Sequence, residues 1–520
     1  MISSLRFAFS LLREFKHPCS ADESRRLLRD FVATRSDNFI SLCESGIFGK
    51  PRSPYHRLLT WAGYSKERLT ALVRSQGLES ALARIASDGV YLDIEEFKGR
   101  KPVIRPGLEI HVDASQFDRT SGPSLQFQSS GSRGTPLQTR VGMKGFKLFA
   151  SYIPLMLEFL EARLLPLILY YPMPSASGMA HLIIFSLAGV PPKAWFAQVM
   201  KSPWYRHKTG LKYMALIAGA RLFHMALPFP HLADIHHPAA LAQWIKKNCP
   251  EGAIVSTFTG SALHLVQAAR SERIAIPPLT FILGGEPITR RKRDELEREH
   301  HRVFPWFSSV ESGRIAIGCL RPDHPDDMHL LSDRFATILR PRRVNPLGAE
   351  RSALLFTSVH PDSYKFLLNT ETGDEAVIGE RKCGCPWESL GLRWHIHSLQ
   401  SFEKLTLEGM SYVSDVFSRL AEETLPAQCG GTPVDYQFVE EEDHQGFTRL
   451  VVLVSPSLAV DEEEVRRIVF ESLSTSSPGF PLMTDLLRRA SSVIIRRDYP
   501  RLTRSGKILT LRTERGEKKR

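Results

Sequence analysis

The chain has 520 residues, of which 42% are hydrophobic and 24% charged, a balance that excludes a disordered chain and predicts two or three packed units. Its net charge of +12 comes from 68 lysines and arginines scattered among 56 acids, with no zinc-finger spacing and no RNA-binding motif, so no nucleic-acid partner is expected. The basic cluster at residues 290–293 is accordingly interpreted as solvated surface.

The first part of the chain predicts helices. Residues 2–16 place Leu5, Phe9, Leu12 and Phe15 on one face of an amphipathic helix. Charged residues interrupt this stretch and no cleavage pattern follows it, which argues against a secretion signal.

A second helical region spans residues 65–87, where Gly77 breaks the helical spacing of the apolar residues. The longest uncharged stretch begins at Leu164 and is interrupted by prolines and by Gly178. A membrane span needs about 20 mostly apolar residues in succession, so this stretch predicts a buried strand, a turn and an apolar helix instead. With no secretion signal, no span and only seven cysteines, the sequence predicts a cytoplasmic protein.

From about residue 124 the pattern alternates between strands and helices, as in an α/β protein. Three buried strands are expected there, at residues 165–171, 278–285 and 353–359. After about residue 400 the pattern changes to two strands around a turn, a helix and a further strand, at residues 434–442, 447–454, 461–474 and 491–498.

The predicted fold class is therefore α/β, with two domains joined near residues 398–405. A large multi-sheet domain is expected over residues 1–400, mainly helical up to residue 110. A small, mobile α+β domain is expected over residues 401–520 and acts as a lid.

Residues 127–136 read FQSSGSRGTP. Leu125 and Phe127 alternate with glutamines, so a strand is expected to lead directly into this loop. Glycines allow backbone amides to turn inward around an anion, and hydroxyls add donors. A flexible linker is the alternative interpretation of the segment when it is considered alone.

This loop resembles the phosphate-binding signature of the adenylate-forming (AMP-binding) enzyme superfamily. Further stretches resemble the remaining signatures of that superfamily, in the same order: FILGGEPIT at 281–289, WFSSVESG at 306–313, NTETGDEAVI at 369–378 and YPRLTRSGKIL at 499–509. Each has a plain structural reading by itself, as a turn, a helix cap or a basic tail. Five in order over nearly the whole chain identify it as a divergent member of the superfamily.

The resemblance implies roles for particular residues. Lys507 would serve the adenylation step, and Glu311 would hold magnesium. The residues implied to bind the nucleotide are Ser129, Ser130, Gly131, Ser132, Arg133, Gly134, Gly284, Gly285, Glu286, Pro287, Phe307, Ser308 and Asp374. The chain departs from the pattern at Leu137, where a cation is usual, at Val310, where threonine is usual, and around Gln400, where the hinge arginine is missing.

Within the superfamily, the chain is similar to the branch that contains phenylacetate–coenzyme A ligase, because a Cys-x-Cys follows the Thr-Gly-Asp. This branch resemblance implies a structural zinc ion held by Cys319, His329, Cys383 and Cys385. His324 is the alternative histidine ligand. The alternative is that these cysteines are small buried residues.

The implied function is that of an ATP-dependent ligase, which activates a carboxylic acid as an acyl-adenylate and transfers it to a thiol, with coenzyme A as the favoured acceptor. An aromatic acid is favoured and a fatty acid is second. Transfer of the acyl group to a carrier protein or to an amine stays an alternative. A non-catalytic, nucleotide-binding relative is the alternative function, and a homodimer is a possible oligomeric state. Residues 170–185 and 256–266 fit the walls of an acyl pocket, in which His181 either orients a carboxylate or is a core histidine.

Overall fold

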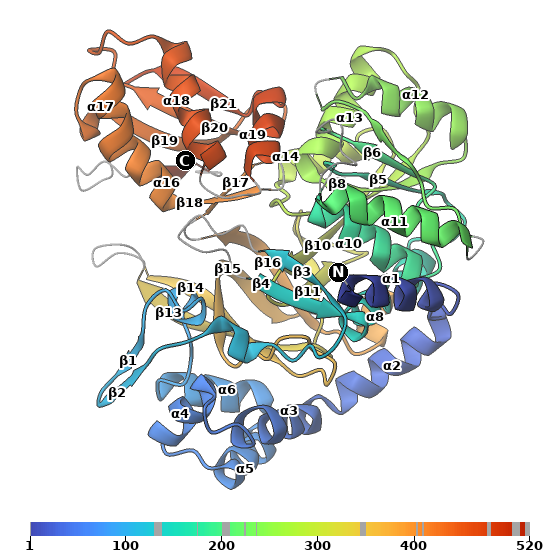
Figure 1. The fold of residues 1–520 in the computed structure, drawn as a ribbon, viewed down its shortest axis with the longest axis vertical. Coiled ribbons are helices and arrows are strands. Elements are labelled where there is room, and N and C mark those ends of the chain that lie inside the picture. The colour runs from blue at the N-terminus through green and yellow to red at the C-terminus, as the bar shows by residue number, and fades with distance from the viewer. Residues whose placement is uncertain are drawn as a thin grey trace.

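The structure is a computed structural model. Figure 1 shows a large domain formed by most of the chain and a smaller C-terminal domain beside it. The residues that the structure describes are 2–128, 138–173, 175–199, 208–222, 225–235, 237–343, 350–401, 404–407, 410–475, 480–501 and 510–514.

The chain begins with helices, as the sequence predicts. Gly77 has a φ of 82° and separates α5 from α6, because that backbone conformation ends a helix. None of the helices among the described residues is long and apolar enough to cross a membrane. The helices of this region are α1 (Ile2–Glu14), α2 (Ala21–Ala33), α3 (Arg35–Cys43), α4 (Pro54–Trp61), α5 (Lys66–Gln76), α6 (Leu78–Ser87) and α7 (Ile94–Phe97).

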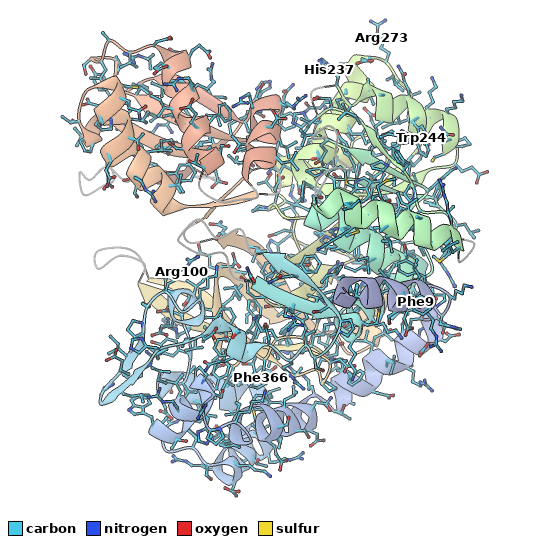
Figure 2. All side chains as sticks on the ribbon, viewed as in Figure 1. Phe9, Arg100, His237, Trp244, Arg273 and Phe366 are labelled. Atoms are coloured by element: carbon cyan, nitrogen blue, oxygen red, sulfur yellow. The ribbon has the colours of Figure 1, made fainter. Side chains whose placement is uncertain are left out.

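The apolar face predicted for α1 is partly wrong. Phe9 is 64% exposed and points away from the core (Figure 2). Phe7 and Leu11 are buried in its place, together with Leu12 and Phe15. Two apolar stripes overlap on this helix, and the stripe that contains Phe7 is the one that meets α8 and α11. The side chain of Leu5 lies outside the described part.

A twelve-stranded sheet forms the centre of the large domain, in the order β13-β14-β15-β16-β12-β11-β10-β9-β8-β5-β6-β7. The strands from β10 to β7 run parallel, and those from β13 to β11 are antiparallel to their neighbours. The parallel strands are β5 (Leu167–Tyr170), β6 (Ala194–Ala197), β7 (Pro230–Leu232), β8 (Ala253–Phe258), β9 (Leu279–Gly284) and β10 (Arg302–Ser309). The others are β11 (Gly313–Gly318), β12 (Met328–Leu330), β13 (Phe335–Arg343), β14 (Glu350–Ser358), β15 (Thr370–Glu380) and β16 (Trp394–Ser401).

The three predicted strands of this domain are confirmed as β5, β9 and β14. Their continuous apolar runs follow from burial on both faces. In β5, Leu167 and Leu169 enter one hydrophobic core, whereas Ile168 and Tyr170 enter a second core on the opposite face. The helices of this part are α8 (Met143–Ala150), α9 (Ile153–Phe159), α10 (Ala176–Leu187), α11 (Lys208–Leu222), α12 (Ala239–Asn248), α13 (Thr259–Ser271), α14 (Arg290–Glu297) and α15 (Pro386–Ser389).

Short two-stranded sheets complete the large domain and its junction. They are β1 (Val103–Arg105) with β2 (Leu108–Ile110), β3 (Ser124–Gln128) with β4 (Gln138–Gly142), and β17 (Lys404–Leu407) with β18 (Met410–Val413).

The C-terminal domain is a separate α+β unit with its own hydrophobic core. Its sheet has the order β21-β20-β19-β22, and the predicted elements of this region are all present. The fold class is therefore confirmed, while the boundary at residue 400 stays a prediction. The elements are α16 (Ser414–Arg419), α17 (Leu425–Cys429), β19 (Tyr436–Glu442), β20 (Thr448–Val454), α18 (Glu462–Thr475), α19 (Phe480–Arg489), β21 (Val493–Arg497) and β22 (Leu511–Glu514).

The basic cluster at 290–293 is not simply solvated surface, which corrects the sequence interpretation. Lys292 is only 2% exposed, and its ammonium donates to the Thr448 hydroxyl of the small domain at 2.8 Å. Arg291 donates to the backbone carbonyl of Asp443 at 2.6 Å. The cluster is therefore part of the contact between the two domains.

Candidate active site

The turn that joins β10 to β11 carries Glu311. The Tyr364 hydroxyl donates to the backbone carbonyl of Val310 in this turn at 2.8 Å. Gly313 has a φ of 76°, and a Cβ there would overlap the ring of Phe149. The turn is therefore held from two sides, which fixes the start of the Glu311 side chain.

Lys98 lies beside Glu311, a neighbour that the sequence reasoning missed. The Lys98 ammonium is 4.0 Å from Glu311 Oε1, and the two side chains are 9% and 13% exposed. Lys98 is the residue directly after α7. The next residue, Gly99, has a φ of 67° and lies so close to the Val112 carbonyl that there is no room for a side chain. The only signal in the sequence was a cation followed by glycine at the end of a short helix.

The Gly-Gly-Glu-Pro turn follows the end of β9. A Cβ on Gly284 would overlap the indole nitrogen of Trp306, so this glycine lets the next strand pack closely. Gly285 has a φ of 82°, and Glu286 accepts a hydrogen bond of 3.2 Å from the amide of Gly260 at the start of α13. The backbone carbonyl of Pro287 faces the Lys292 ammonium at 3.4 Å.

The end of β10 carries the next pair of predicted nucleotide ligands. Phe307 is half-buried and its ring centre lies 6.3 Å from that of Phe356, whereas Ser308 is exposed. Because β9 and β10 are parallel neighbours, their carboxyl ends meet at one edge of the sheet, where α/β proteins bind ligands. The structure therefore brings two of the predicted motifs together at Trp306.

Asp374 lies on β15, and the Thr372 hydroxyl donates to its Oδ2 at 3.0 Å. Gly373 has a φ of 83°, and its carbonyl accepts from the Ser401 hydroxyl at 3.1 Å. Helix α7 packs against β15, and Lys98 directly follows its last residue, so one short segment touches both the Asp374 strand and Glu311.

Other predicted residues lie outside the described part of the chain. These are the loop residues Ser129, Ser130, Gly131, Ser132, Arg133, Gly134 and Leu137, and the catalytic candidate Lys507. The strand expected to lead into the loop is confirmed as β3, which pairs with β4 so that Gln128 lies opposite Gln138.

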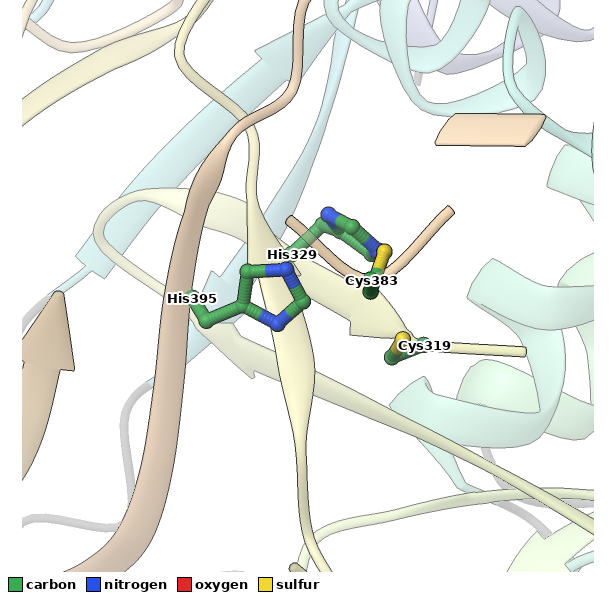
Figure 3. Close-up of side chains that lie close together, drawn as sticks. All are labelled: Cys319, His329, Cys383 and His395. Carbon is green, nitrogen blue, oxygen red and sulfur yellow. The ribbon is translucent and has the colours of Figure 1, made fainter. Parts of the chain in front are cut away.

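A buried group of sulfur and imidazole side chains lies on the antiparallel side of the sheet (Figure 3). The ligand atoms of Cys319, His329, Cys383 and His395 all lie within 4.8 Å of one another. Cys385 is also present, with its sulfur 3.1 Å from His329 Nε2. The four residues predicted from the sequence are thus gathered, and His395 on β16 is an addition that the sequence reasoning missed.

The surroundings of this cluster orient its donor atoms. His329 Nδ1 donates to the Leu392 carbonyl at 2.8 Å, which leaves Nε2 toward the sulfurs. His395 Nδ1 donates to Asp327 at 2.7 Å, and its Nε2 is buried without a hydrogen-bond partner among the described residues.

A hydrogen bond with Cys319, and then one with His329, lower the pKa of Cys385 below its usual range. A thiolate with imidazole nitrogens fits the donor set of a tetrahedral zinc site. His324 stacks on His397 at 3.7 Å between ring centres and has no place in the group.

His181 lies in a group of stacked rings. Its ring centre is 4.7 Å from that of Tyr171 and 5.1 Å from that of Trp306. Its Nδ1 donates to the Ser177 carbonyl at 2.8 Å, and burial lowers its pKa to about 3. At neutral pH its Nε2 therefore carries no proton with which to bind a carboxylate, which favours the core interpretation of this histidine.

Comparison with known proteins yields matches among solved structures alone. No family model matches the chain, and no curated protein matches it. The structure of 2-hydroxyisobutyryl-CoA ligase in complex with 2-HIB-AMP and CoA has a TM-score of 0.55 and 16% sequence identity, over 93% of this chain and 90% of that one. The amide bond synthetase McbA from Marinactinospora thermotolerans has a TM-score of 0.41 and 13% identity, over 96% and 97% of the two chains.

The likeness to the CoA ligase establishes the fold over most of the length of the chain. The chain therefore has the fold of the adenylate-forming enzymes, as the motif order predicted.

Proposed function

We propose that the chain is an ATP-dependent ligase that activates a carboxylic acid as an acyl-adenylate and transfers the acyl group to the thiol of coenzyme A. One observation carries this proposal. The Gly-Gly-Glu-Pro turn and the Glu311 turn follow neighbouring parallel strands and meet at Trp306. The order of the motifs and the fold of a CoA ligase support the same conclusion.

In the first step, a carboxylate oxygen attacks the α-phosphorus of ATP and the bond to pyrophosphate breaks. Pyrophosphate leaves with the bonding electron pair, and the product is a mixed anhydride with AMP. The step gathers negative charge, so it needs preorganised donors and cations. In the proposal, the donors come from the loop at 129–134, and the cations are Lys507 and Lys98.

Glu311 is the residue that would hold Mg²⁺, because a carboxylate is a ligand that this hard cation prefers. When bound, the metal would neutralise charge on the phosphate groups. Lys98 already brings one positive charge to the same carboxylate.

In the second step, the thiol sulfur attacks the acyl carbon and AMP leaves with the electron pair of the broken bond. The thiol proton is released, and the acyl group becomes a thioester. An amine acceptor or a carrier-protein thiol would follow the same path, so these acceptors remain alternatives. An aromatic acid remains the favoured substrate and a fatty acid the second.

We also propose that the cysteine–histidine cluster holds one structural zinc ion. The buried nitrogen of His395 without a partner, the second imidazole and the low pKa of the Cys385 thiol support this assignment. Five donors are available for four positions, and His395 is the candidate that competes with Cys385. A site closed by four protein ligands performs no chemistry, so its role is to hold β11, β12 and β16 to the loop after β15.

The test is acid-dependent ATP–pyrophosphate exchange against a panel of aromatic and aliphatic acids, followed by release of AMP on addition of coenzyme A. Exchange that requires an acid supports the ligase. ATP binding without exchange for any acid favours the non-catalytic alternative. Exchange without thioester formation on addition of coenzyme A, but with product on addition of an amine, favours the amide-forming alternative.

A further inference from the structure

Arg314 is a buried cation with no counter-ion in the part of the chain that the structure describes. It is the second residue of β11 and is 7% exposed. Among the residues that the structure describes, none forms an ion pair or a hydrogen bond with its guanidinium, and its Nε is buried without a partner. Its one close ring contact is Trp306, whose ring centre lies 3.3 Å from the guanidinium carbon.

Arg334 shows what a structural buried arginine looks like in the same molecule. It is 1% exposed, yet its Nε donates to the Tyr152 hydroxyl at 3.1 Å and lies 4.0 Å from the carboxylate of Asp333. Its Nη2 also donates to the Leu148 carbonyl. Arg334 is therefore hydrogen-bonded within the core, whereas the guanidinium of Arg314 has no such bonds among the described residues.

Leaving a charge buried and unpaired is costly, so a side chain in this state commonly marks a site whose counter-charge arrives from outside the chain. Burial, followed by repulsion from Arg334, lowers the pKa of Arg314 well below its ordinary value, but a guanidinium stays protonated at neutral pH. The Tyr171 hydroxyl also acts on Arg314, and burial raises its own pKa. Arg314 in turn acts on His181, whose pKa is lowered by burial and then by Arg314. None of these groups supplies a negative charge at neutral pH.

The position of Arg314 points to the acid substrate. Trp306 also stacks on His181, and His181 stacks on Tyr171, within the segment predicted to form the acyl-pocket wall. Arg314 follows Glu311 by three residues, a separation that spans at most about 11 Å of chain. An anion bound to Arg314 therefore lies within the reach of a small acid whose other end reacts near Glu311.

We propose that Arg314 binds a second carboxylate of the substrate, so that the acid is a dicarboxylic acid with an apolar or aromatic body. This rests on the proposed ligase function. The anchored carboxylate is not the reacting one, because a tight guanidinium pair withdraws electron density from the oxygen that must attack phosphorus. Arginine suits the role because its planar fork matches a carboxylate with two parallel hydrogen bonds.

The experiment measures acid-dependent ATP–pyrophosphate exchange with matched acids: benzoate against isophthalate and terephthalate, phenylacetate against 1,4-phenylenediacetate, and hexanoate against adipate. The wild type is expected to prefer a diacid over its monoacid by about 100-fold in kcat/KM, the scale of losing one partner of a buried charge pair. Arg314→Met is expected to lose that preference. Arg314→Lys keeps the positive charge but loses the planar guanidinium, and it is expected to retain part of the preference for the diacid.

Thermal unfolding gives a readout that does not depend on activity. Without ligand, Arg314→Met is expected to unfold at a higher temperature than the wild type, because it removes an uncompensated buried charge. The matched control Arg334→Met is expected to unfold at a lower temperature, because it breaks a bonded network. Diacid alone is expected to stabilise the wild type but not Arg314→Met.

The outcomes separate the two proposals. A wild type that exchanges with no acid refutes the proposed function, whether or not it binds a fluorescent ATP analogue. A wild type that exchanges with monoacids but uses diacids no better, or is not stabilised by diacid, overturns the inference alone. A destabilised or unfolded Arg314→Met also overturns the inference, because Arg314 would then stabilise the fold instead of serving as a binding site for an anion.

Discussion

Replacing Lys98 tests whether the candidate metal-binding carboxylate depends on a neighbour from the N-terminal helices. Coulomb's law at 4.0 Å, with an effective dielectric constant of about 20, gives an attraction of about 4 kcal/mol between Lys98 and Glu311. The costs of desolvation and of ordering both side chains oppose this attraction. We therefore expect a net coupling of about 2 kcal/mol, because the pair is nearly buried.

The assay is a double-mutant cycle of Lys98→Met and Glu311→Gln, read as the free energy of unfolding in denaturant. In Lys98→Met, the orphaned carboxylate is expected to make Mg²⁺ more stabilising than in the wild type, because the metal replaces the lost positive charge. Lys101→Met is the control, since its ammonium pairs with Asp93 at 2.6 Å but is 50% exposed, and such pairs contribute about 0–1 kcal/mol. Additive effects of the two substitutions, with no added response to Mg²⁺, would refute the reasoning.

Three further predictions concern other parts of the molecule. Protein purified without chelator is expected to contain about one zinc ion per chain. Cys383→Ser is expected to lower the stability of the fold before it alters the choice of acid. Elemental analysis that finds no zinc in folded protein would remove the zinc assignment. Lys507→Ala is expected to slow adenylation by about 100- to 1,000-fold, whereas acyl-adenylate supplied to this variant is expected to react with thiol as in the wild type. The control Arg504→Ala is expected to change the rate little. Normal acid-dependent exchange in Lys507→Ala would contradict the role of Lys507. Gly284→Ala is expected to displace Trp306 and to destabilise the chain by about 1–3 kcal/mol, and unchanged denaturant unfolding would show that the strands have room to move apart.

Where local pattern and tertiary environment agree, the sequence was sufficient to predict the fold. The continuous apolar runs of β5 and β9 need burial on both faces, and only a covered parallel sheet offers it. Gly77 and Gly285 adopt positive φ, so the turns that were read from glycine have a local physical cause. The same local logic placed the strand before the loop at 129–137.

The failures have a common physical origin in contacts between distant segments. The role of Lys292 depends on Thr448, which lies 156 positions further along the chain. Phe9 and Phe7 are equally apolar, and only the packing of α1 against its neighbours decides which one is buried. No local pattern could have revealed these outcomes.

The candidate site was predicted to a similar degree. The motifs singled out the Gly-Gly-Glu-Pro turn and Glu311, and the structure places both after neighbouring parallel strands; their roles stay predictions. Lys98 and His395 were missed because each acquires its meaning from a residue that folding brings near, Glu311 in one case and the two cysteines in the other. Arg314 was missed because its significance lies in the absence of a counter-ion among the described residues, which no sequence pattern can reveal.

The docking of the small domain on α14 and on the segment after β7 has a consequence for the energetics of the domain arrangement. Its polar contacts include the Lys292–Thr448 and Arg291–Asp443 hydrogen bonds and the Arg489–Asp234 ion pair. Every one of them favours a single orientation, so they set an equilibrium constant between that orientation and any other. A ligand that reverses a population of 1 in 100 to 99 in 100 must bind the second orientation about 10,000-fold more tightly. If the chain binds nucleotide as proposed and its small domain reorients, residues such as Lys292 would set how much of the binding free energy is used to change the domain orientation.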